Sequence, residues 1–250
     1  MVDTGLVRHH RHPGGDILAG SYAVVSPHLD DAVLSCGLFL AANPGSLVVT
    51  AFTHGPPSVS PLPRWDADSR YFPDGADVMA VRRGEDISAA AMASAATAHL
   101  GYWDGQYRTR EYGYQGMPTE DLPAAIATDL AARAREHPAL AWVIPLGIHH
   151  PDHEITAEAG LIFAAGHPGP VYLYEELPYA RRYPRVVTAR RKSLRQHGYT
   201  LAPDPAFSLA PDQASKAAVV GCHASQRRAL GRGLQTALRS PERIWRLVRR

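Results

Sequence analysis

The sequence predicts an α/β fold in a single domain, with a mostly parallel sheet that carries helices on both faces. Short apolar runs alternate with Ala-rich, helical stretches along the chain, which is the order that a parallel sheet requires. At 250 residues, of which 45% are hydrophobic, the chain can bury one sizeable core. Two polar clusters each follow an apolar run, as expected where parallel strands end at the same edge of a sheet.

The first expected strand covers residues 21–26, and a helix then opens at Asp30 or Asp31. A second strand covers residues 46–52. The stretch 56–77 is rich in Pro, Asp and Ser and shows no periodic pattern. A loop of this length in a compact domain is commonly functional, so we expect it to form a lid or a wall of the substrate site.

The next elements follow from composition. Residues 81–100 are expected to be helical because of their Ala content, and residues 102–103 to form a short third strand. Another Ala-rich helix is expected at residues 122–136, between Pro118 and Pro138. The remaining expected elements are strands at 140–145 and 171–174 and a helix at 155–165.

We divide the chain into a mobile N-terminal arm (1–20), a catalytic domain (21–230) and a basic C-terminal extension (231–250). The basic C-terminal stretch allows two interpretations: amphipathic helices that contact a membrane surface or a partner, or a solvated helix that packs its Leu side on the core. We favour the second.

Composition points to a cytoplasmic protein without a nucleic-acid or membrane partner. No apolar stretch is long enough for a signal peptide or a membrane span. Cys36 and Cys222 are too few for a disulfide framework and fit a reducing compartment. A net charge of +2 gives no general case for a nucleic-acid partner. The sequence leaves the oligomeric state open.

The two polar clusters together suggest one metal site. They are Pro27-His28-Leu29-Asp30-Asp31 and His149-His150-Pro151-Asp152-His153. Either alone is compatible with a solvated turn, but two such clusters at the ends of apolar runs favour a shared site. Imidazoles and a carboxylate suit zinc, and three protein ligands leave a position for a water whose pKa the metal lowers. This predicts a hydrolase. Neither a GxGxxG sequence nor a GxSxG elbow is present, which argues against a dinucleotide enzyme and a serine hydrolase.

At this point the chain resembles the LmbE-like, or PIG-L, family of zinc-dependent N-deacetylases, whose hallmarks are His-X-Asp-Asp after the first strand and a later His-X-X-His. The resemblance runs from about Ala23 to Leu230 and implies a Rossmann-like fold. Its further motifs are Arg82-Arg83-Gly84-Glu85-Asp86, the segment His99 to Arg108, Tyr174-Glu175-Glu176-Leu177-Pro178-Tyr179, Lys216, and His223-X-X-Gln226.

The resemblance implies roles for the residues of both clusters. His28, Asp31 and His153 match the three metal ligands, with zinc, or another divalent ion such as Fe²⁺, as the cofactor. Asp30 matches the general base that takes a proton from the attacking water. His150 matches the histidine that, as an imidazolium, stabilises the oxyanion.

Other positions are assigned more loosely. Asp152 is expected behind the ligands, where it accepts a hydrogen bond from His150 or a ligand imidazole. His149 has no family counterpart, which favours a structural role. The residues expected to contact substrate are Arg82, Asp104, His54, Glu175 and Tyr179.

The predicted function is removal of an N-acyl group, an acetyl group in the first instance, from an amino sugar or a sugar-bearing small molecule in cofactor or natural-product biosynthesis. Leu29 and Ala32 depart from the His-Pro-Asp-Asp-Glu form that many family members carry, which weakens a transfer of substrate from the thiol-cofactor branch. Two alternatives remain: an amidase that acts on a non-sugar amide, and a metal-bearing binding protein without turnover. The presence of Asp30 argues against the second.

Overall fold

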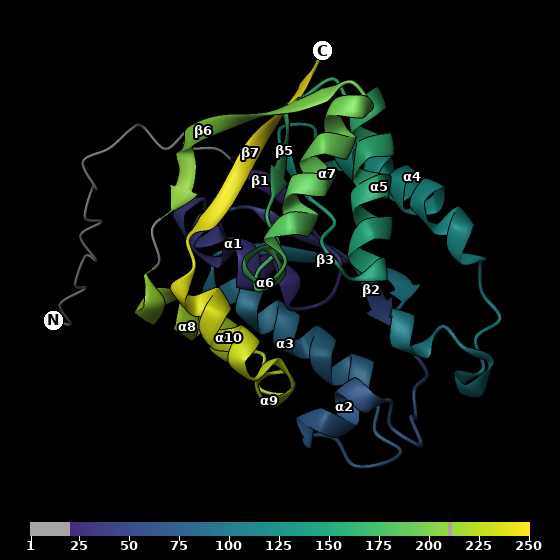
Figure 1. Cartoon of the computed structure of the whole chain (residues 1–250). Helices are drawn as coiled ribbons and strands as arrows, with labels where there is room; N and C mark the ends of the chain where they lie inside the picture. The colour runs from purple at the N-terminus through teal and green to yellow at the C-terminus, as the bar shows by residue number, and fades with distance from the viewer. Residues whose placement is uncertain (1–20, 210–211) are drawn as a thin grey trace, which may run out of the picture.

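A computed structural model describes residues 21–209 and 212–250 of the chain, and the expected arm at 1–20 lies outside these residues. The described part contains one sheet with the strand order β3-β2-β1-β4-β5-β7-β6 (Figure 1). The strands are β1 (Tyr22–Ser26), β2 (Leu47–His54), β3 (Ala96–Trp103), β4 (Ala141–Pro145), β5 (Val171–Tyr174), β6 (Tyr199–Leu209) and β7 (Glu242–Arg249). The helices are α1 (Asp31–Ala42), α2 (Arg64–Ser69), α3 (Val78–Met92), α4 (Leu122–Glu136), α5 (Pro151–Gly166), α6 (Tyr179–Arg182), α7 (Pro184–Gln196), α8 (Gln213–Gly221), α9 (Arg227–Leu230) and α10 (Arg232–Arg239).

The central strands are parallel, which confirms the predicted fold class. β1 lies between β2 and β4, and Val24 pairs with Val48 on one side and Val143 on the other. All five residues of β1 are buried because helices cover both faces of the sheet. Figure 1 shows α4, α5 and α7 on one side of the sheet and α1, α3, α8 and α10 on the other.

The strand order reverses at β1, and this positions the site. β2 and β3 extend the sheet in one direction from β1, and β4 and β5 extend it in the other. In open α/β sheets, ligands bind outside the carboxyl ends of the strands where the order reverses. The loops after β1 and β4 are therefore neighbours at the usual place for a site.

The expected helix at 81–100 is wrong in its second half. α3 ends at Met92, Ser94 adopts a φ of 57°, and β3 covers Ala96–Trp103 rather than the two residues expected. β3 is the edge strand, and most of its side chains are half-buried or exposed. Because it packs only partly against the core, it lacks the apolar signature of a buried strand.

The C-terminal segment 231–250 does not form an extension outside the fold. It contains α10 and then β7, which runs antiparallel between β5 and β6 inside the sheet. Glu242 at the start of β7 is fully buried, 3.0 Å from the Nζ of Lys216, and accepts hydrogen bonds from the backbone N–H groups of Leu38 and Phe39. These N–H groups follow a break in α1 at Cys36.

No helix in the described residues combines the length and the apolar character needed to cross a membrane.

Candidate metal and catalytic site

The turn after β1 is held by its own side chains. Ser26 accepts a hydrogen bond from the backbone N–H of Ala32 at 3.0 Å and donates its hydroxyl to the carbonyl of His28 at 2.6 Å. Asp31, the first residue of α1, accepts a hydrogen bond from the backbone N–H of His28 at 2.9 Å. The turn therefore brings the side chains of His28 and Asp31 together, with Nδ1 and Oδ2 3.1 Å apart.

The loop after β4 is organised by a single buried carboxylate. Glu176 accepts hydrogen bonds from the backbone N–H groups of Leu146, Gly147 and Ile148 at 3.2, 2.7 and 2.9 Å. Gly147 has a φ of 83°, and a Cβ there would lie 2.6 Å from the Cβ of Ala157. The loop consequently requires glycine at this position.

The start of α5 presents the second polar cluster. His150 is the N-cap residue, and its ring Nδ1 accepts a hydrogen bond from the backbone N–H of Asp152 at 3.2 Å. Pro151 occupies the first helical position, where a missing N–H costs nothing. His153 lies in the same turn of the helix and is completely buried.

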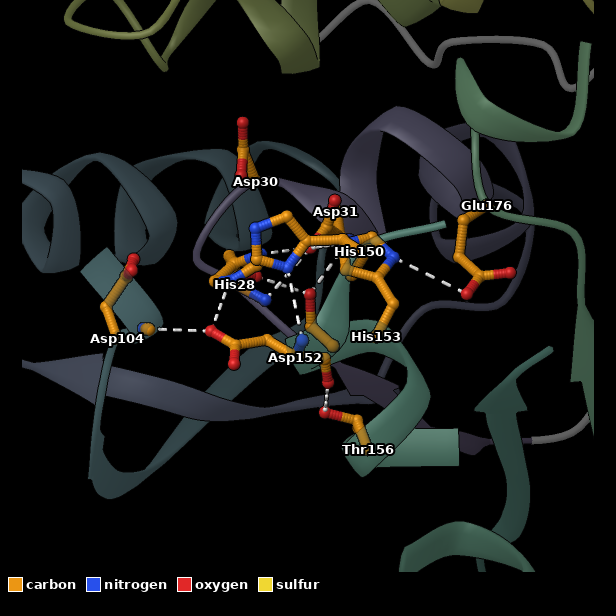
Figure 2. A network of polar contacts seen from close by, with 12 residues as sticks. His28, Asp30, Asp31, Asp104, His150, Asp152, His153, Thr156 and Glu176 are labelled. Atoms are coloured by element: carbon orange, nitrogen blue, oxygen red, sulfur yellow. Dashed lines mark hydrogen bonds and ion pairs between the residues drawn. The ribbon is translucent and has the colours of Figure 1, made fainter. Parts of the chain in front are cut away.

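His28, Asp31 and His153 converge on one point (Figure 2). The Oδ2 atom of Asp31 lies 3.1 Å from Nδ1 of His28 and 3.1 Å from Nε2 of His153. A ring nitrogen of His150 also lies within 4.8 Å of ring nitrogens of His28 and His153. Two imidazole nitrogens and one carboxylate oxygen around a common point are a donor set that suits a divalent metal ion.

The buried imidazole of His153 supports this interpretation. Its two ring nitrogens make no hydrogen bond within the described residues, although Nδ1 lies 3.4 Å from Glu176 and Nε2 faces Asp31. Buried polar atoms without a partner are rare in folded proteins and call for a bound group. The residues present therefore fit a metal ion.

Electrostatics favours a positive charge at the same point. Burial alone would lower the pKa of His153, but the facing carboxylates of Asp31 and Glu176 raise it to about 9. Burial likewise opposes the charge on His28, yet Asp152 and Asp31 raise the pKa of its imidazole well above the ordinary value. Without metal, protons supply the positive charge that these carboxylates favour, and a metal ion would displace them.

A chain of contacts fixes His28 from behind. Its Nε2 lies 3.0 Å from Oδ2 of Asp152, a carboxylate with no solvent exposure. Asp152 also accepts hydrogen bonds from the backbone N–H of Gly105 at 2.9 Å and from the guanidinium of Arg108. Burial would raise the pKa of Asp152, but His28 and Arg108 hold it well below its usual range. The ionised carboxylate keeps a proton on Nε2 of His28, so that the proton displaced by a metal ion would be the one on Nδ1, which faces Asp31.

His150 differs from its neighbour His153. Burial and the positive charges of His28 and His153 lower the pKa of His150 to about 4. Because Nδ1 accepts a backbone hydrogen bond, the neutral ring carries its proton on Nε2. The imidazolium expected from the sequence is therefore replaced by a neutral imidazole near pH 7.

Asp30 faces a different set of partners. Figure 2 shows its carboxylate directed away from the histidines, on the opposite side of the turn from Asp152. Burial and the neighbouring charge of Asp31 raise the pKa of Asp30, while Arg82, 3.8 Å away, opposes the shift. Arg82 is itself buried and also donates to Asp104 at 3.3 Å.

A cavity of about 260 Å³ opens beside these groups. We call its mostly buried lining the floor: His28, Asp30, Asp31, Leu34, Arg82, Asp104 and His150. We call its partly exposed lining the mouth: Trp65, Gln106, Pro178, Tyr179, Arg182, Ala229, Leu230 and Gly233. Trp65 lies in the stretch 56–77, which was expected to be a loop that forms a lid or a substrate wall but which contains the short helix α2.

The structure does not bring every expected residue to the cavity. Tyr179 lines it, but His54 is exposed and packs against the ring of Trp103. Glu175 accepts hydrogen bonds from Arg191 and from Trp245 Nε1, away from the cavity lining.

The roles of three further residues cannot be read from the sequence immediately around them. His149 adopts a φ of 70° and stacks on Tyr183 with ring centroids 3.8 Å apart, a structural contact. Glu176 and Arg108 were recognised only as parts of motifs, because their partners lie on other elements of the fold.

Comparison with known proteins agrees with the geometry. The PIG-L family model, described as GlcNAc-PI de-N-acetylase, matches residues 23–164, more than half of the chain. No curated protein sequence matches.

Solved structures of deacetylases match most of the chain. The zinc-inhibited form of teicoplanin deacetylase Orf2 is 28% identical with a TM-score of 0.75, and the A40926 pseudoaglycone deacetylase Dbv21 is 26% identical with a TM-score of 0.73. A deacetylase–teicoplanin complex is 27% identical with a TM-score of 0.68. The alignments cover 92% of this chain in each case and 98%, 98% and 99% of the respective relatives.

Proposed function

The chain belongs to the PIG-L (LmbE-like) family, and we propose that it is a zinc-dependent N-deacetylase that acts on an amino sugar of a natural product. The observation that carries this proposal is the convergence of His28, Asp31 and His153 on one point beside the cavity. The teicoplanin and A40926 deacetylases support the substrate class and indicate a small molecule as the substrate.

His28, Asp31 and His153 would hold the metal through Nδ1, Oδ2 and Nε2. A divalent ion bound there supplies Lewis acidity, which lowers the pKa of a water and polarises a carbonyl. Glu176 holds the ring of His153 from behind, and Asp152 does the same for His28. Fe²⁺ is the principal rival to zinc because imidazole and carboxylate also suit it.

Asp30 takes a proton from the attacking water as its oxygen bonds to the amide carbon. When the C–N bond breaks, the same proton is passed to the departing amine, and acetate is released. The raised pKa of Asp30 helps the first step because the conjugate base of a weaker acid is a stronger base. His150 donates its Nε2–H to the carbonyl oxygen as negative charge develops on it.

Arg82 and Asp104 lie on the floor beside Asp30 and would bind sugar hydroxyls. A guanidinium donates hydrogen bonds and a carboxylate accepts them, so the pair can recognise a diol. Their mutual contact at 3.3 Å fixes both groups before substrate arrives.

The experiment is an acetate-release assay over N-acetylated amino sugars and their glycosides. The expected result is equal release of acetate and free amine, abolished by dipicolinate and restored by about one equivalent of zinc. Zinc must be added stoichiometrically because a relative was described in a zinc-inhibited form. No acetate from any glycoside, with the metal bound, would contradict the proposal.

Asp30→Asn tests the base. The variant should retain metal and lose about 100-fold or more in turnover, since general-base help contributes that much. Asp121→Asn, an exposed carboxylate outside the cavity lining, is the control and should leave turnover unchanged. Full activity of Asp30→Asn would assign the proton transfer to another group.

A further inference from the structure

The cavity lining contains two arginines in different situations. Arg82 on the floor is committed to two carboxylates, Asp104 at 3.3 Å and Asp30 at 3.8 Å. Arg182 at the mouth is exposed, and its guanidinium lies 5.6 Å from the ring centroid of Tyr183. Among the described residues, no carboxylate lies within ion-pair distance of Arg182. Arg182 is thus a cation beside the cavity with free hydrogen-bond donors.

The surroundings of Arg182 carry the same sign. Within three residues of Arg182, Ala229 or Gly233 in the sequence, the exposed arginines without a carboxylate partner in the described part of the chain are Arg181, Arg185, Arg227, Arg228 and Arg232. Such a field concentrates anionic ligands and speeds their association.

The rest of the mouth is apolar and fixed. Trp65 is 38% exposed and donates its indole N–H to Gln226 at 2.7 Å. Together with Pro178 and Leu230, it contributes apolar surface to the lining. The cavity therefore combines a hydrolytic floor, apolar surface and an unpaired guanidinium.

We propose that the substrate is an anionic N-acetyl amino-sugar conjugate, in which a carboxylate or phosphate on the group attached to the sugar binds Arg182. This inference rests on the proposed function. With the acetamide at the floor, the group attached to the sugar extends to the mouth. A planar guanidinium binds either oxyanion through two parallel hydrogen bonds. One exposed ion pair contributes little, so the surrounding arginines are needed for a measurable preference.

The test compares matched glycosides. 4-Carboxyphenyl and 4-methylphenyl N-acetyl-β-glucosaminide differ in charge at similar shape, and N-acetylglucosamine 1-phosphate is set against the methyl N-acetylglucosaminide. We expect kcat/KM to be about tenfold higher for the anionic member of at least one pair, mainly through KM. The preferred pair identifies the anion as carboxylate or phosphate. The ratio should shrink between about 0.05 M and about 0.5 M NaCl because salt screens exposed charges.

Variants assign the effect to Arg182. Arg182→Gln should bring the ratio close to unity, and Arg182→Lys should retain part of it. Arg195→Gln, an exposed arginine of α7 outside the cavity lining, is the matched control and should preserve the ratio. Equal kcat/KM within both pairs, or an unchanged ratio in Arg182→Gln, would overturn the inference.

A binding measurement separates this inference from the proposed function. Asp30→Asn, loaded with zinc, is titrated calorimetrically with the same four glycosides, so that no turnover is needed. Tighter binding of the anionic members supports the role of Arg182 even if no acetate is released by the wild type. If the variant binds all four glycosides equally and the wild type releases acetate from each, the proposed deacetylase function stands and the anion preference is wrong.

Discussion

The floor and the mouth of the cavity differ in how the charges of their side chains are balanced. On the floor, His28 and Asp31 contact each other, and Arg82 contacts two carboxylates. At the mouth, Arg182 stands among exposed arginines without a carboxylate in reach within the described residues. Groups whose charges are balanced by fixed neighbours are preorganised for a reaction, whereas unbalanced exposed charges are available to select a ligand.

The same contrast separates chemistry from folding. The floor comes from the loops after β1, β3 and β4 and from the helices α1 and α3, whereas the C-terminal segment closes the sheet through β7 and buries Lys216 against Glu242. Substitutions on the floor should abolish activity and leave the fold unchanged. Substitutions in the buried pair of Lys216 and Glu242 should lower the free energy of unfolding and leave the activity of the folded protein unchanged.

The largest effect is expected from His153→Ala. The variant should lose the bound metal, measured by elemental analysis, and at least about 1,000-fold in kcat/KM, because Lewis-acid stabilisation is worth several kcal/mol. The fold should persist because the two carboxylates that face His153 keep other partners: Asp31 contacts His28, and Glu176 accepts backbone hydrogen bonds from the loop after β4. His137→Ala, an exposed histidine at the end of α4, is the control. Stoichiometric metal in His153→Ala would show that the ligand set is different.

Lys216→Met should produce the opposite pattern. It leaves Glu242 buried without its cation, which should lower the free energy of unfolding by about 3 to 5 kcal/mol in urea denaturation. The activity of the folded fraction should be unchanged, and Lys192→Met, which is exposed, should be neutral in both assays. A normal unfolding free energy in Lys216→Met would show that water reaches Glu242.

The pH dependence of this loss has a defined sign. Burial is the largest cause of the raised pKa of Glu242 in the folded protein. A carboxyl group whose pKa is raised by folding stabilises the folded state when it is protonated. This contribution is complete when the pH is below the unfolded-state pKa of about 4.3, and it is lost as the pH rises through the folded-state pKa. The difference in the free energy of unfolding between the wild type and Lys216→Met should therefore become smaller as the pH falls.

These two regions also differ in what the sequence could predict. The sequence could indicate one shared site because both polar clusters follow apolar strands and the ends of adjacent parallel strands must meet. The family resemblance then implied His28, Asp31 and His153 as the ligands within those clusters. β7 was missed because its arginines recur at every third residue, a spacing that resembles the polar face of a helix, although Ile244 and Glu242 are buried within the sheet. Lys216 was noticed as a motif residue, but its partner lies 26 positions away in the sequence and only the fold joins them.

The expected substrate contacts at His54 and Glu175 show a second limit. Both residues follow strands at the correct edge of the sheet, yet neither lines the cavity. The strand order reverses at β1, so the cavity forms there and not beside every strand end. Strand order depends on non-local pairing, which a single sequence does not display.

His150→Ala should have an intermediate effect and sharpen the comparison of the two histidines of α5. Loss of one donor to the developing oxyanion should lower kcat by about 100-fold while the metal remains bound. A pKa near 4 means that His150 is charged only in acid, so the alkaline limb of the pH–rate profile should survive in the variant. Loss of the alkaline limb in His150→Ala would instead show that His150 acts as the imidazolium expected from the sequence.

The smallest effect is expected from Arg108→Met, which removes a cation that reaches the metal only through two other residues. Arg108 donates to Asp152 and lies over the ring of Phe52, 4.7 Å from its centroid. Without the guanidinium, Asp152 should bind a proton more readily and hold the His28 tautomer less firmly, so metal affinity should fall by about 10-fold to 100-fold.

Competition with a chelator measures that affinity for Arg108→Met, and the visible absorption of the cobalt-substituted protein reports whether the ligand geometry has changed. Arg108→Lys should recover part of the affinity because it restores the charge but not the two-pronged geometry. Arg83→Met is the matched control, since Arg83 is also partly buried but donates to the carbonyl of Thr53 and not to Asp152. If the affinities of Arg108→Met and Arg83→Met fall equally, the loss is one of general packing, and the chain of contacts from Arg108 through Asp152 to His28 does not act on the metal.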